Sequence, residues 1–282
     1  MNLDKVRGRI DLHTHTNASD GLLSPTKLIE YSLLKGLQAV AITDHDTTDG
    51  IDEGISAGKK YKVDVIPGIE LNSQIDNQEI HILGYFINRS SRELQDVLLK
   101  MRISRKNRTK KMVEKLIELY GFPISFDDIL NQVQGETIGR PHIARMLVSK
   151  KLINDEKEAF EKYIGTDCPA YIKRYHITPK EAVELIKNAG GVPVLAHPGL
   201  LPEPDLMEKV LNVGIQGIEA YHSKHTQDQA DYYSAVAKSH GLVITGGSDC
   251  HGNLFNGLPI VGDVCVGMET VNELRKLANF SF

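Results

Sequence analysis

Short apolar runs alternate with longer segments of helical periodicity over most of the chain. The runs are rich in Val and Ile, which is typical of strands buried on both faces of a sheet. They predict strands at Arg9–His13, Ala39–Thr43, Val63–Pro67, Glu79–Tyr85, Val192–Ala196, Ile215–Ala220, Leu242–Thr245 and Val261–Val266. The intervening segments predict helices at Pro25–Gly36, Ile51–Tyr61, Pro179–Asn188, Asp205–Leu211, Asp228–His240 and Val271–Ala278. This alternation indicates an α/β fold with a parallel sheet, either closed into a barrel or open and doubly wound.

The alternation is interrupted between about Ser90 and Tyr171, where no strand pattern is convincing. This stretch instead predicts helices at Arg92–Tyr120, Phe126–Gln134, Arg140–Lys150 and Asp155–Ile164. We therefore expect an all-helical insertion domain over residues 90–171, within a barrel domain formed by residues 1–89 and 172–282. Because βα loops line the active mouth of a barrel, an insertion in such a loop is well placed to act as a lid.

Composition narrows the class of protein without identifying a function. The chain has 282 residues, 41% of them hydrophobic and 25% charged, which suits one large α/β domain or a domain with an insertion. Its formal net charge of −4 argues against nonspecific nucleic-acid binding by the whole surface, although a local basic patch stays open. The three cysteines have no regular spacing, and no leader or stretch of about 20 apolar residues is visible. We expect a reduced, cytoplasmic protein that does not enter a membrane.

Histidines and acidic residues lie in or just after most of the predicted strands. Since the carboxyl ends of parallel barrel strands meet at one mouth, residues far apart in sequence can converge there. A mixture of imidazole and carboxylate without thiolate suits Zn²⁺, Mn²⁺ or Fe²⁺ and excludes a structural zinc site of the cysteine type. The pattern therefore predicts a polynuclear metal site, with nine candidate ligands: His13, His15, Asp20, His45, Glu70, His81, His197, Asp249 and His251.

Spacing supports several of these candidates. His13 and His15 are two residues apart at the end of a strand, so their side chains point the same way and can reach one metal. Asp249 and His251 repeat that spacing after a later strand. Glu70 could bridge two cations, because a carboxylate has two oxygens.

Each candidate also has a structural alternative when it is taken alone. Asp20 could be a turn residue, Glu70 a solvated residue at the rim, and His81 a satisfied core histidine. Jointly these alternatives are weak, because chance would not place a histidine or an acid near the end of almost every strand.

With these residues in view, the chain resembles the PHP family, named for polymerase and histidinol phosphatase. The resemblance covers Arg9–Tyr85 and about Thr178–Val266. It rests on the motifs His13-Thr14-His15, Asp20-Gly21, Thr43-Asp44-His45, Gly68-Ile69-Glu70, His81, His197-Pro198 and Ser248-Asp249-Cys250-His251.

The resemblance implies a distorted (β/α)7 barrel that holds two or three divalent metal ions, Mn, Zn or Fe. By carry-over from the family, one metal would be held by His13, His15, Glu70 and Asp249. A second would be held by Asp20, His45 and His251, and a third by Glu70, His81 and His197.

Two further segments are similar to the branch of the family that comprises nucleotide phosphatases and RNA 5′-end trimming enzymes. They are Gly139–Arg145 in the insertion and Glu219–His225 after a later strand. Arg140 would open a helix beside Pro141, so its guanidinium and the free N–H groups of the helix could bind phosphate. The alternative for Arg140 is a solvated cap residue. His142 and His225 are further candidates for phosphate contacts, and His222 is a weaker one.

The first helix of the insertion is strongly basic. Its charges could form an ordinary solvated face or guide a polyanion toward the active mouth. No aromatic residue interleaves with them, so the sequence does not support an extended base-stacking track. The basic residues are Lys100, Arg102, Arg105, Lys106, Arg108, Lys110 and Lys111.

The resemblance implies a metal-dependent phosphoric ester hydrolase. We expect a hydroxide that bridges two cations to attack phosphorus in line, with charge on the phosphoryl oxygens stabilised by the metals and Arg140. The residues expected to be catalytic are Asp20, His45, Glu70, Arg140 and His225.

The expected substrates are small phosphorylated molecules: a nucleoside 3′,5′-bisphosphate or a nucleoside monophosphate. A 5′-3′ exoribonuclease acting on short RNA 5′ ends is the alternative, and duplex nucleic acid is not an expected partner. Two readings from other classes stay open, a metal-dependent amidohydrolase and a non-catalytic metal module.

Overall fold

The computed structural model describes residues 8–76, 78–131, 137–173, 175–201, 203 and 205–279. The chain forms two compact units: Met1–Asp96 with His176–Phe282, called here the barrel unit, and Val97–Tyr175, called the helical unit. Helix α3 (Arg92–Tyr120) begins in the barrel unit and continues into the helical unit. None of the helices in the described part of the chain is long and apolar enough to span a bilayer.

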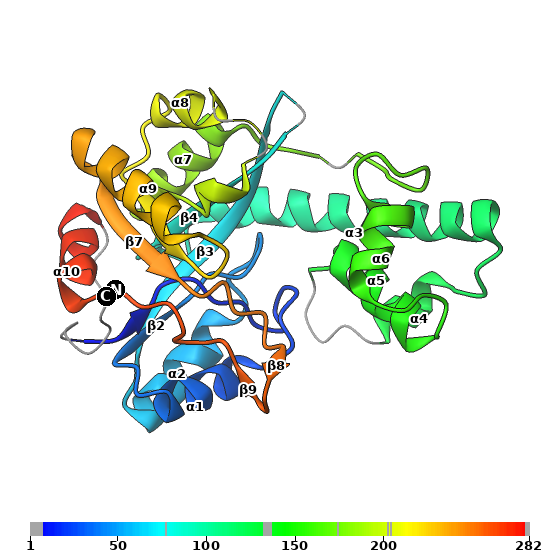
Figure 1. The fold of residues 1–282 in the computed structure, drawn as a ribbon, viewed down its shortest axis with the longest axis horizontal. Helices are drawn as coiled ribbons and strands as arrows, with labels where there is room; N and C mark the ends of the chain where they lie inside the picture. The colour runs from blue at the N-terminus through cyan, green and yellow to red at the C-terminus, as the bar shows by residue number, and fades with distance from the viewer. Residues whose placement is uncertain are drawn as a thin grey trace. The chain divides into compact units, whose positions relative to one another are not determined.

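A seven-stranded sheet forms the centre of the barrel unit, with its strands in sequence order (Figure 1). The backbone N–H of Leu12 donates to the carbonyl of Gly246, and that of Asp249 donates to the carbonyl of His13 at 2.8 Å. These bonds join the two ends of the sheet, so the sheet closes into a distorted barrel, as predicted. The strands are β1 (Ile10–Asp11), β2 (Ala39–Ile42), β3 (Asp64–Ile75), β4 (Gln78–Tyr85), β5 (Val192–Leu195), β6 (Gly217–His222) and β7 (Val243–Gly247).

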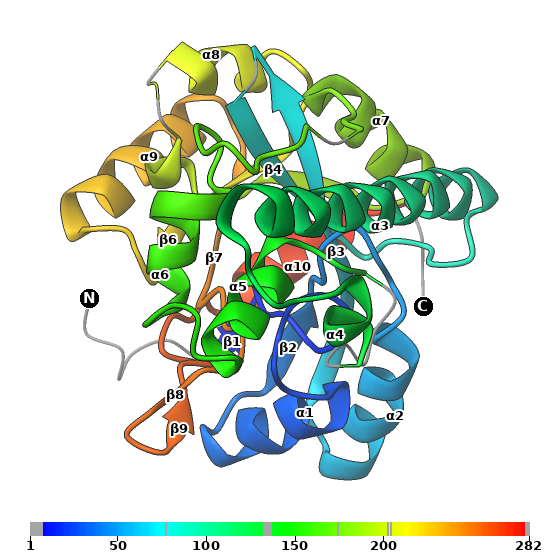
Figure 2. The same cartoon turned by 90° about the vertical axis from the view of Figure 1, so that its right-hand side faces the viewer.

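Helices surround this sheet on the outside (Figure 2). Their ends follow local signals: α7 begins with a capping box in which Thr178 accepts from the Glu181 N–H, and Pro179 occupies its first turn. The inward side chains of the strands, the coil beside them and the apolar face of α10 form a buried core that includes Leu12, Val192 and Val194. The helices are α1 (Pro25–Leu34), α2 (Ile51–Tyr61), α7 (Pro179–Asn188), α8 (Asp205–Leu211), α9 (Gln227–Ser239) and α10 (Met268–Leu277), with a 3-10 turn η3 (Pro198–Leu200).

The direction of β4 contradicts the prediction of a wholly parallel sheet. β4 runs antiparallel to both β3 and β5, whereas the other neighbouring pairs are parallel. The physical reason lies in the connection: only two residues separate β3 from β4, and a parallel crossover needs a dozen or more. β3 is also longer than predicted, so Glu70 lies within it rather than beyond its end.

The predicted strand at Val261–Val266 is wrong. This segment is a series of turns, and Val266 alone pairs with Ile10, in an antiparallel bridge. Val261 and Val266 are nevertheless buried, so the apolar pattern reflects burial of a coil rather than a strand. The Gly262 N–H donates to the Asp11 carboxylate at 2.8 Å, which fixes this coil to β1.

The helical unit has a hydrophobic core of its own, which includes Met112, Leu116, Ile143 and Leu147. No strand is assigned to residues 97–131, 137–173 or 175. Residues 132–134 of the predicted helix Phe126–Gln134 lie outside the described residues. Besides α3, the unit contains α4 (Phe126–Leu130), α5 (Arg140–Ser149), α6 (Glu156–Ala159) and the π-helical turn η2 (Phe160–Ile164).

Candidate metal centre

All nine predicted metal ligands belong to the barrel unit, and the structure gathers their side chains into one cluster. Most lie on the coil that follows a strand, whereas Glu70 and His81 lie inside β3 and β4. His81 still reaches the cluster because β4 runs in the opposite direction, which sets His81 opposite Asn72 near the carboxyl end of β3.

Four ligand atoms at the centre of the cluster have the spacing of a metal site. They are Nε2 of His13, Nε2 of His15, Oε2 of Glu70 and Oδ1 of Asp249. Five of the distances between them lie from 3.1 to 3.5 Å. A tetrahedron whose corners lie about 2.1 Å from a central ion has edges of about 3.4 Å. These five distances match the edges of a tetrahedral divalent site. Two overlapping groups have all their ligand atoms within 4.8 Å of one another: His13, His15 and Glu70, and His13, His222 and Asp249.

Glu70 connects this group to a second one. Its Oε1 lies 2.8 Å from Nδ1 of His81 and 3.0 Å from Nε2 of His197, and the two histidine nitrogens are 3.3 Å apart. Its Oε2, which belongs to the first group, also lies 3.1 Å from Nδ1 of His45. The side chain is only 1% exposed. Each carboxylate oxygen thus faces its own set of histidines, which is the arrangement of a bridging ligand.

Asp20 is the centre of a third, looser group. Its carboxylate oxygens lie 3.4 Å from Nε2 of His251, 3.8 Å from Nδ1 of His15 and 3.9 Å from Nε2 of His45. One ligand atom from each of these four residues lies within 4.8 Å of every other. His45 stands between two groups, since its Nδ1 faces Glu70 and its Nε2 faces Asp20.

The protonation chemistry of the cluster fits cations. Nδ1 of His13 lies 3.0 Å from the buried carboxylate of Glu219 and must donate its hydrogen there, so Nε2 of the neutral imidazole presents a lone pair. That nitrogen lies 3.1 Å from Nε2 of His15, and two lone pairs at this distance need a proton or a metal ion between them. Nδ1 of His15 is buried without a hydrogen-bond partner, which leaves it open to a ligand role as well.

The pKa shifts in the cluster also indicate that it favours bound cations. Burial disfavours the charged form of His15, yet hydrogen bonds to Asp249 and Glu70 outweigh burial and raise its pKa to about 10. Burial would raise the pKa of the Glu70 carboxyl, but the facing histidines His45 and His13 hold it well below its usual range. The cluster is therefore a site of negative potential that favours bound positive charge, which a divalent cation supplies in place of protons.

Glu219 is a site residue for which the sequence analysis assigned no role. It lies in β6, is fully buried, and accepts from Nδ1 of His13 and from the backbone N–H of His197 at 2.8 Å. Burial would raise its pKa, but His13 lowers it below the usual value, so the carboxylate is charged. A signal was present in the sequence, since an acid within the apolar run Gly217-Ile218-Glu219-Ala220 has to find a partner when buried.

Two candidate ligands have a strained backbone. His197 has φ +27° and Asp249 has φ +55°, and non-glycine residues seldom adopt such angles. Backbone strain of this kind persists where the surrounding contacts over-determine it, and it clusters at functional sites. The bond from His197 N–H to Glu219 and that from Asp249 N–H to the carbonyl of His13 supply such contacts.

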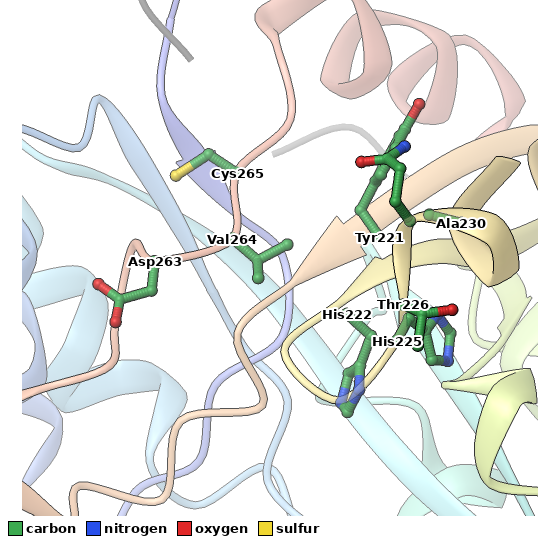
Figure 3. A pocket seen from close by; sticks show the side chains of 9 residues that line it. Tyr221, His222, His225, Thr226, Ala230, Asp263, Val264 and Cys265 are labelled. Carbon is green, nitrogen blue, oxygen red and sulfur yellow. The ribbon is translucent and has the colours of Figure 1, made fainter. Parts of the chain in front are cut away.

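Two histidines, His222 at the end of β6 and His225 just after it, line a pocket of about 220 Å³ (Figure 3). His225 donates from Nδ1 to the carbonyl of Ala220 at 2.8 Å, and its Nε2 accepts from the Gly199 N–H at 3.0 Å. Both nitrogens are thus engaged by the backbone, and burial lowers the pKa of this imidazole. His222, the weaker candidate in the sequence, is buried with Nε2 only 3.3 Å from Oδ2 of Asp249.

The other predicted phosphate contacts lie in the helical unit. Nδ1 of His142 accepts from the Gly139 N–H at 3.1 Å, which caps α5. The guanidinium of Arg140 lies over the rings of Phe160 and Tyr171, at 5.6 and 5.8 Å from their centroids. These contacts are all internal to the unit, and a role in phosphate binding stays a prediction for both residues.

Comparison with known proteins places the chain in a family. A model of the PHP domain matches residues 11–166, more than half of the chain. A 5′-3′ exoribonuclease of Haemophilus influenzae is 32% identical over 248 residues, which cover 86% of this chain and 90% of the relative. A 3′,5′-nucleoside bisphosphate phosphatase of Chromobacterium violaceum is also 32% identical over 248 residues, covering 86% of this chain and 87% of the relative.

A solved structure agrees with these relatives. It comes from Bifidobacterium adolescentis, is itself inferred to be a metal-dependent phosphoesterase, and superposes with a TM-score of 0.87 at 32% identity. The match covers 95% of this chain and 96% of that one. The predicted fold and the predicted class of enzyme, a metal-dependent phosphoric ester hydrolase, are confirmed. The chain belongs to the PHP family of metal-dependent phosphoesterases.

Proposed function

We propose that the barrel unit binds two or three divalent cations, Mn, Zn or Fe, and removes phosphate from a nucleoside 3′,5′-bisphosphate or a nucleoside monophosphate. The observation that carries the proposal is the position of Glu70. Its two oxygens face separate sets of histidines, at 2.8 to 3.3 Å, as a carboxylate shared between cations would. A C. violaceum relative named for nucleoside bisphosphate hydrolysis supports the choice of substrate.

Different residues of the chain would have separate roles in this reaction. His13, His15, Glu70 and Asp249 would hold one cation, and Asp20 and Glu70 would each share a further cation with neighbouring histidines. Bound cations would supply an activated water and neutralise charge on the phosphoryl oxygens. Glu219 keeps the lone pair of His13 Nε2 directed into the cluster by holding the hydrogen on Nδ1.

The helical unit would contribute to substrate recognition. Arg140 opens α5, where a guanidinium and the N-terminal N–H groups of a ten-residue helix can together bind a phosphate. His142 and His225 stay proposed contacts, although His225 would have to release the Gly199 N–H to offer Nε2 to a phosphate. The role of residues 90–171 as a lid and the cytoplasmic location also stay predictions.

A second candidate function is 5′-3′ exoribonuclease activity on short RNA. Two observations favour it: an H. influenzae relative that carries this name, and the basic residues along α3. Amide hydrolysis, the alternative from another class, would use an uncharged substrate and gives these basic residues no role.

A panel of substrates tests the proposal. Purified protein supplied with Mn²⁺ should release phosphate from adenosine 3′,5′-bisphosphate or AMP, and nothing from simple amides. Asp249→Asn should lower that rate at least a hundred-fold, because a neutral amide is a poor ligand for a divalent cation. Asp76→Asn, an exposed acid of the same unit paired with Lys209, is the matched control and should keep the wild-type rate.

Two results would contradict the proposal. One is a folded Asp249→Asn protein that works at the wild-type rate. The other is amide hydrolysis in the absence of phosphate release. Release of mononucleotides from a 5′-phosphorylated RNA, with the bisphosphate left intact, would select the second candidate instead.

A further inference from the structure

A groove of about 500 Å³ lies within the helical unit, and all the residues that line it belong to that unit. One wall is a face of α3 that carries Lys100, Ile103 and Lys111. The other wall is the segment that leaves the unit, represented by Lys173 and Tyr175. The groove is large enough for part of a nucleotide chain, since ligand sites commonly measure about 300–1,000 Å³.

The groove is held in shape by bonds between its two walls. Nε of Arg108 donates to the carbonyl of Ile172 at 2.6 Å, and the Tyr175 N–H donates to Oγ of Ser104 at 3.0 Å. Arg108 is buried, and its guanidinium lies over the ring of Tyr171, 5.0 Å from the centroid. The backbone of the second wall is therefore fixed along α3, which preorganises the groove for a ligand.

The charged side chains that line the groove are positively charged. Lys100, Lys111 and Lys173 are exposed at its surface, and no acidic residue lines it among the described residues. Lys100 and Lys111 are eleven positions apart on α3, which corresponds to about 16 Å along the helix axis. A stacked single strand places one phosphate about every 3.4 Å, so this span matches several phosphates rather than one.

An aromatic platform accompanies the charge. Tyr175 is 50% exposed, and the apolar residue Ile103, which lines the same groove, is 53% exposed. Exposed aromatic rings such as that of Tyr175 stack nucleobases with little regard for sequence. No aromatic residue interleaves with the charges of this helix in the sequence, but the fold brings Tyr175 to Ser104 from 71 positions away. Charge and stacking therefore occur together in the groove.

We propose that this groove binds a single-stranded oligoribonucleotide, with its lysines on phosphates spread along the strand and Tyr175 against a base. The proposal rests on the second function proposed above, and it names the part of the substrate that lies away from the hydrolysed end. A mononucleotide has no chain of phosphates to place along the groove, so the groove would favour longer substrates.

Binding of a defined probe tests the proposal. The probe is a fluorescent, phosphorothioate-linked ten-nucleotide single strand, which keeps the backbone charge and resists hydrolysis, and the full chain is titrated against it. The triple variant Lys100→Gln, Lys111→Gln, Lys173→Gln should bind at least tenfold more weakly. Its plot of log affinity against log salt should be less steep by about 2, because each lost phosphate contact removes about 0.7 from the slope of a single strand.

The matched control removes the same charge elsewhere in the helical unit. Lys106→Gln, Lys110→Gln, Lys157→Gln changes three exposed lysines outside the groove and should keep most of the affinity. Tyr175→Ala should weaken binding about fivefold or more, whereas Tyr175→Phe should bind as the wild type does, because it keeps the ring.

Phosphate release from adenosine 3′,5′-bisphosphate separates this proposal from the proposed function. The groove variants should keep the wild-type rate on that substrate and lose rate only on RNA. The groove proposal would be refuted if the groove triple variant and the control triple variant lost equal affinity for RNA. It would also be refuted if the wild-type protein bound a poly-glutamate peptide as tightly as the RNA probe. Inactivity of the wild type on every phosphate ester, with RNA binding intact, would instead refute the proposed function.

Discussion

Glu219 shows how one buried side chain can control a histidine in the cluster. Its carboxylate takes the Nδ1 hydrogen of His13 and the backbone N–H of His197, so it sets both the tautomer of one proposed ligand and the backbone of another. Partners of this kind typically change metal affinity 10–100-fold when they are removed. The residue therefore supports the proposed metal centre by contacting His13 at Nδ1, the nitrogen that is not assigned to a cation.

Glu219→Gln should lower the affinity for Mn²⁺ or Zn²⁺ about 10–100-fold while the protein stays folded. The amide keeps the size of the side chain but loses the charge that orients His13. Competition with a chelator, followed by metal analysis, measures the loss. Glu273→Gln, at an exposed position on α10, is the control. Wild-type metal affinity in the Glu219 variant would show that the carboxylate does not act on the cluster.

Cysteine reactivity gives a pH-dependent prediction at the same scale. Burial raises the pKa of the Cys265 thiol to about 11, so at pH 8 about one molecule in a thousand carries the thiolate that alkylating reagents attack. Iodoacetamide at pH 8 should label the more accessible Cys168 first, and labelling of Cys265 should increase as the pH approaches 11. Peptide mass spectrometry over time measures both. Early labelling of Cys265 at pH 8 would contradict its burial.

At the scale of elements, strand direction and close packing decide which side chains reach the cluster. The two-residue connection between β3 and β4 reverses β4 and sets His81 opposite Asn72. The end of β7 approaches β1 so closely that a Cβ on Gly247 would overlap the backbone nitrogen and Cβ of His13. This close packing of the Gly247 backbone against His13 restricts the position of His13.

Gly247→Ala should therefore destabilise the protein by about 1–3 kcal/mol and weaken metal binding, because β1 must shift to admit the methyl group. Denaturant unfolding and metal analysis measure the two effects. The control is Gly257→Ala, where φ is +83° and no atom lies within 4 Å of the added Cβ. That variant should show only the smaller cost of backbone strain, with metal binding unchanged. Equal metal affinity in both variants would show that packing at Gly247 does not position His13.

At the scale of the whole molecule, the barrel unit and the helical unit have separate hydrophobic cores. The predicted ligands all lie in the barrel unit, so bound metal should stabilise that unit. A ligand at a hundred times its Kd adds about 2.7 kcal/mol to the free energy of unfolding.

Removal of metal by a chelator should lower the melting temperature of the barrel unit by about 5–10 °C, and added Mn²⁺ or Zn²⁺ should restore it. Differential scanning calorimetry measures this shift. The transition of the helical unit serves as the internal control and should stay in place. If the melting temperature of the barrel unit changed with neither chelator nor added metal, the result would count against a metal centre of this size.

The local elements and the chemistry available to them follow from signals within short stretches of the chain. The bounds of α2, α3, α7 and α8 agree with the predictions, because periodicity, caps and proline positions act within a few residues. The candidate ligands were visible because polar residues so close to buried strand ends are unusual.

Tertiary structure alone decided the direction of β4, the partnership of Glu219 with His13 and the engagement of both nitrogens of His225 by the backbone. It also decided that Tyr175 lies beside the lysines of α3. These features depend on which distant segments pack together, and a pattern read along the chain does not record contacts between residues that are far apart in sequence.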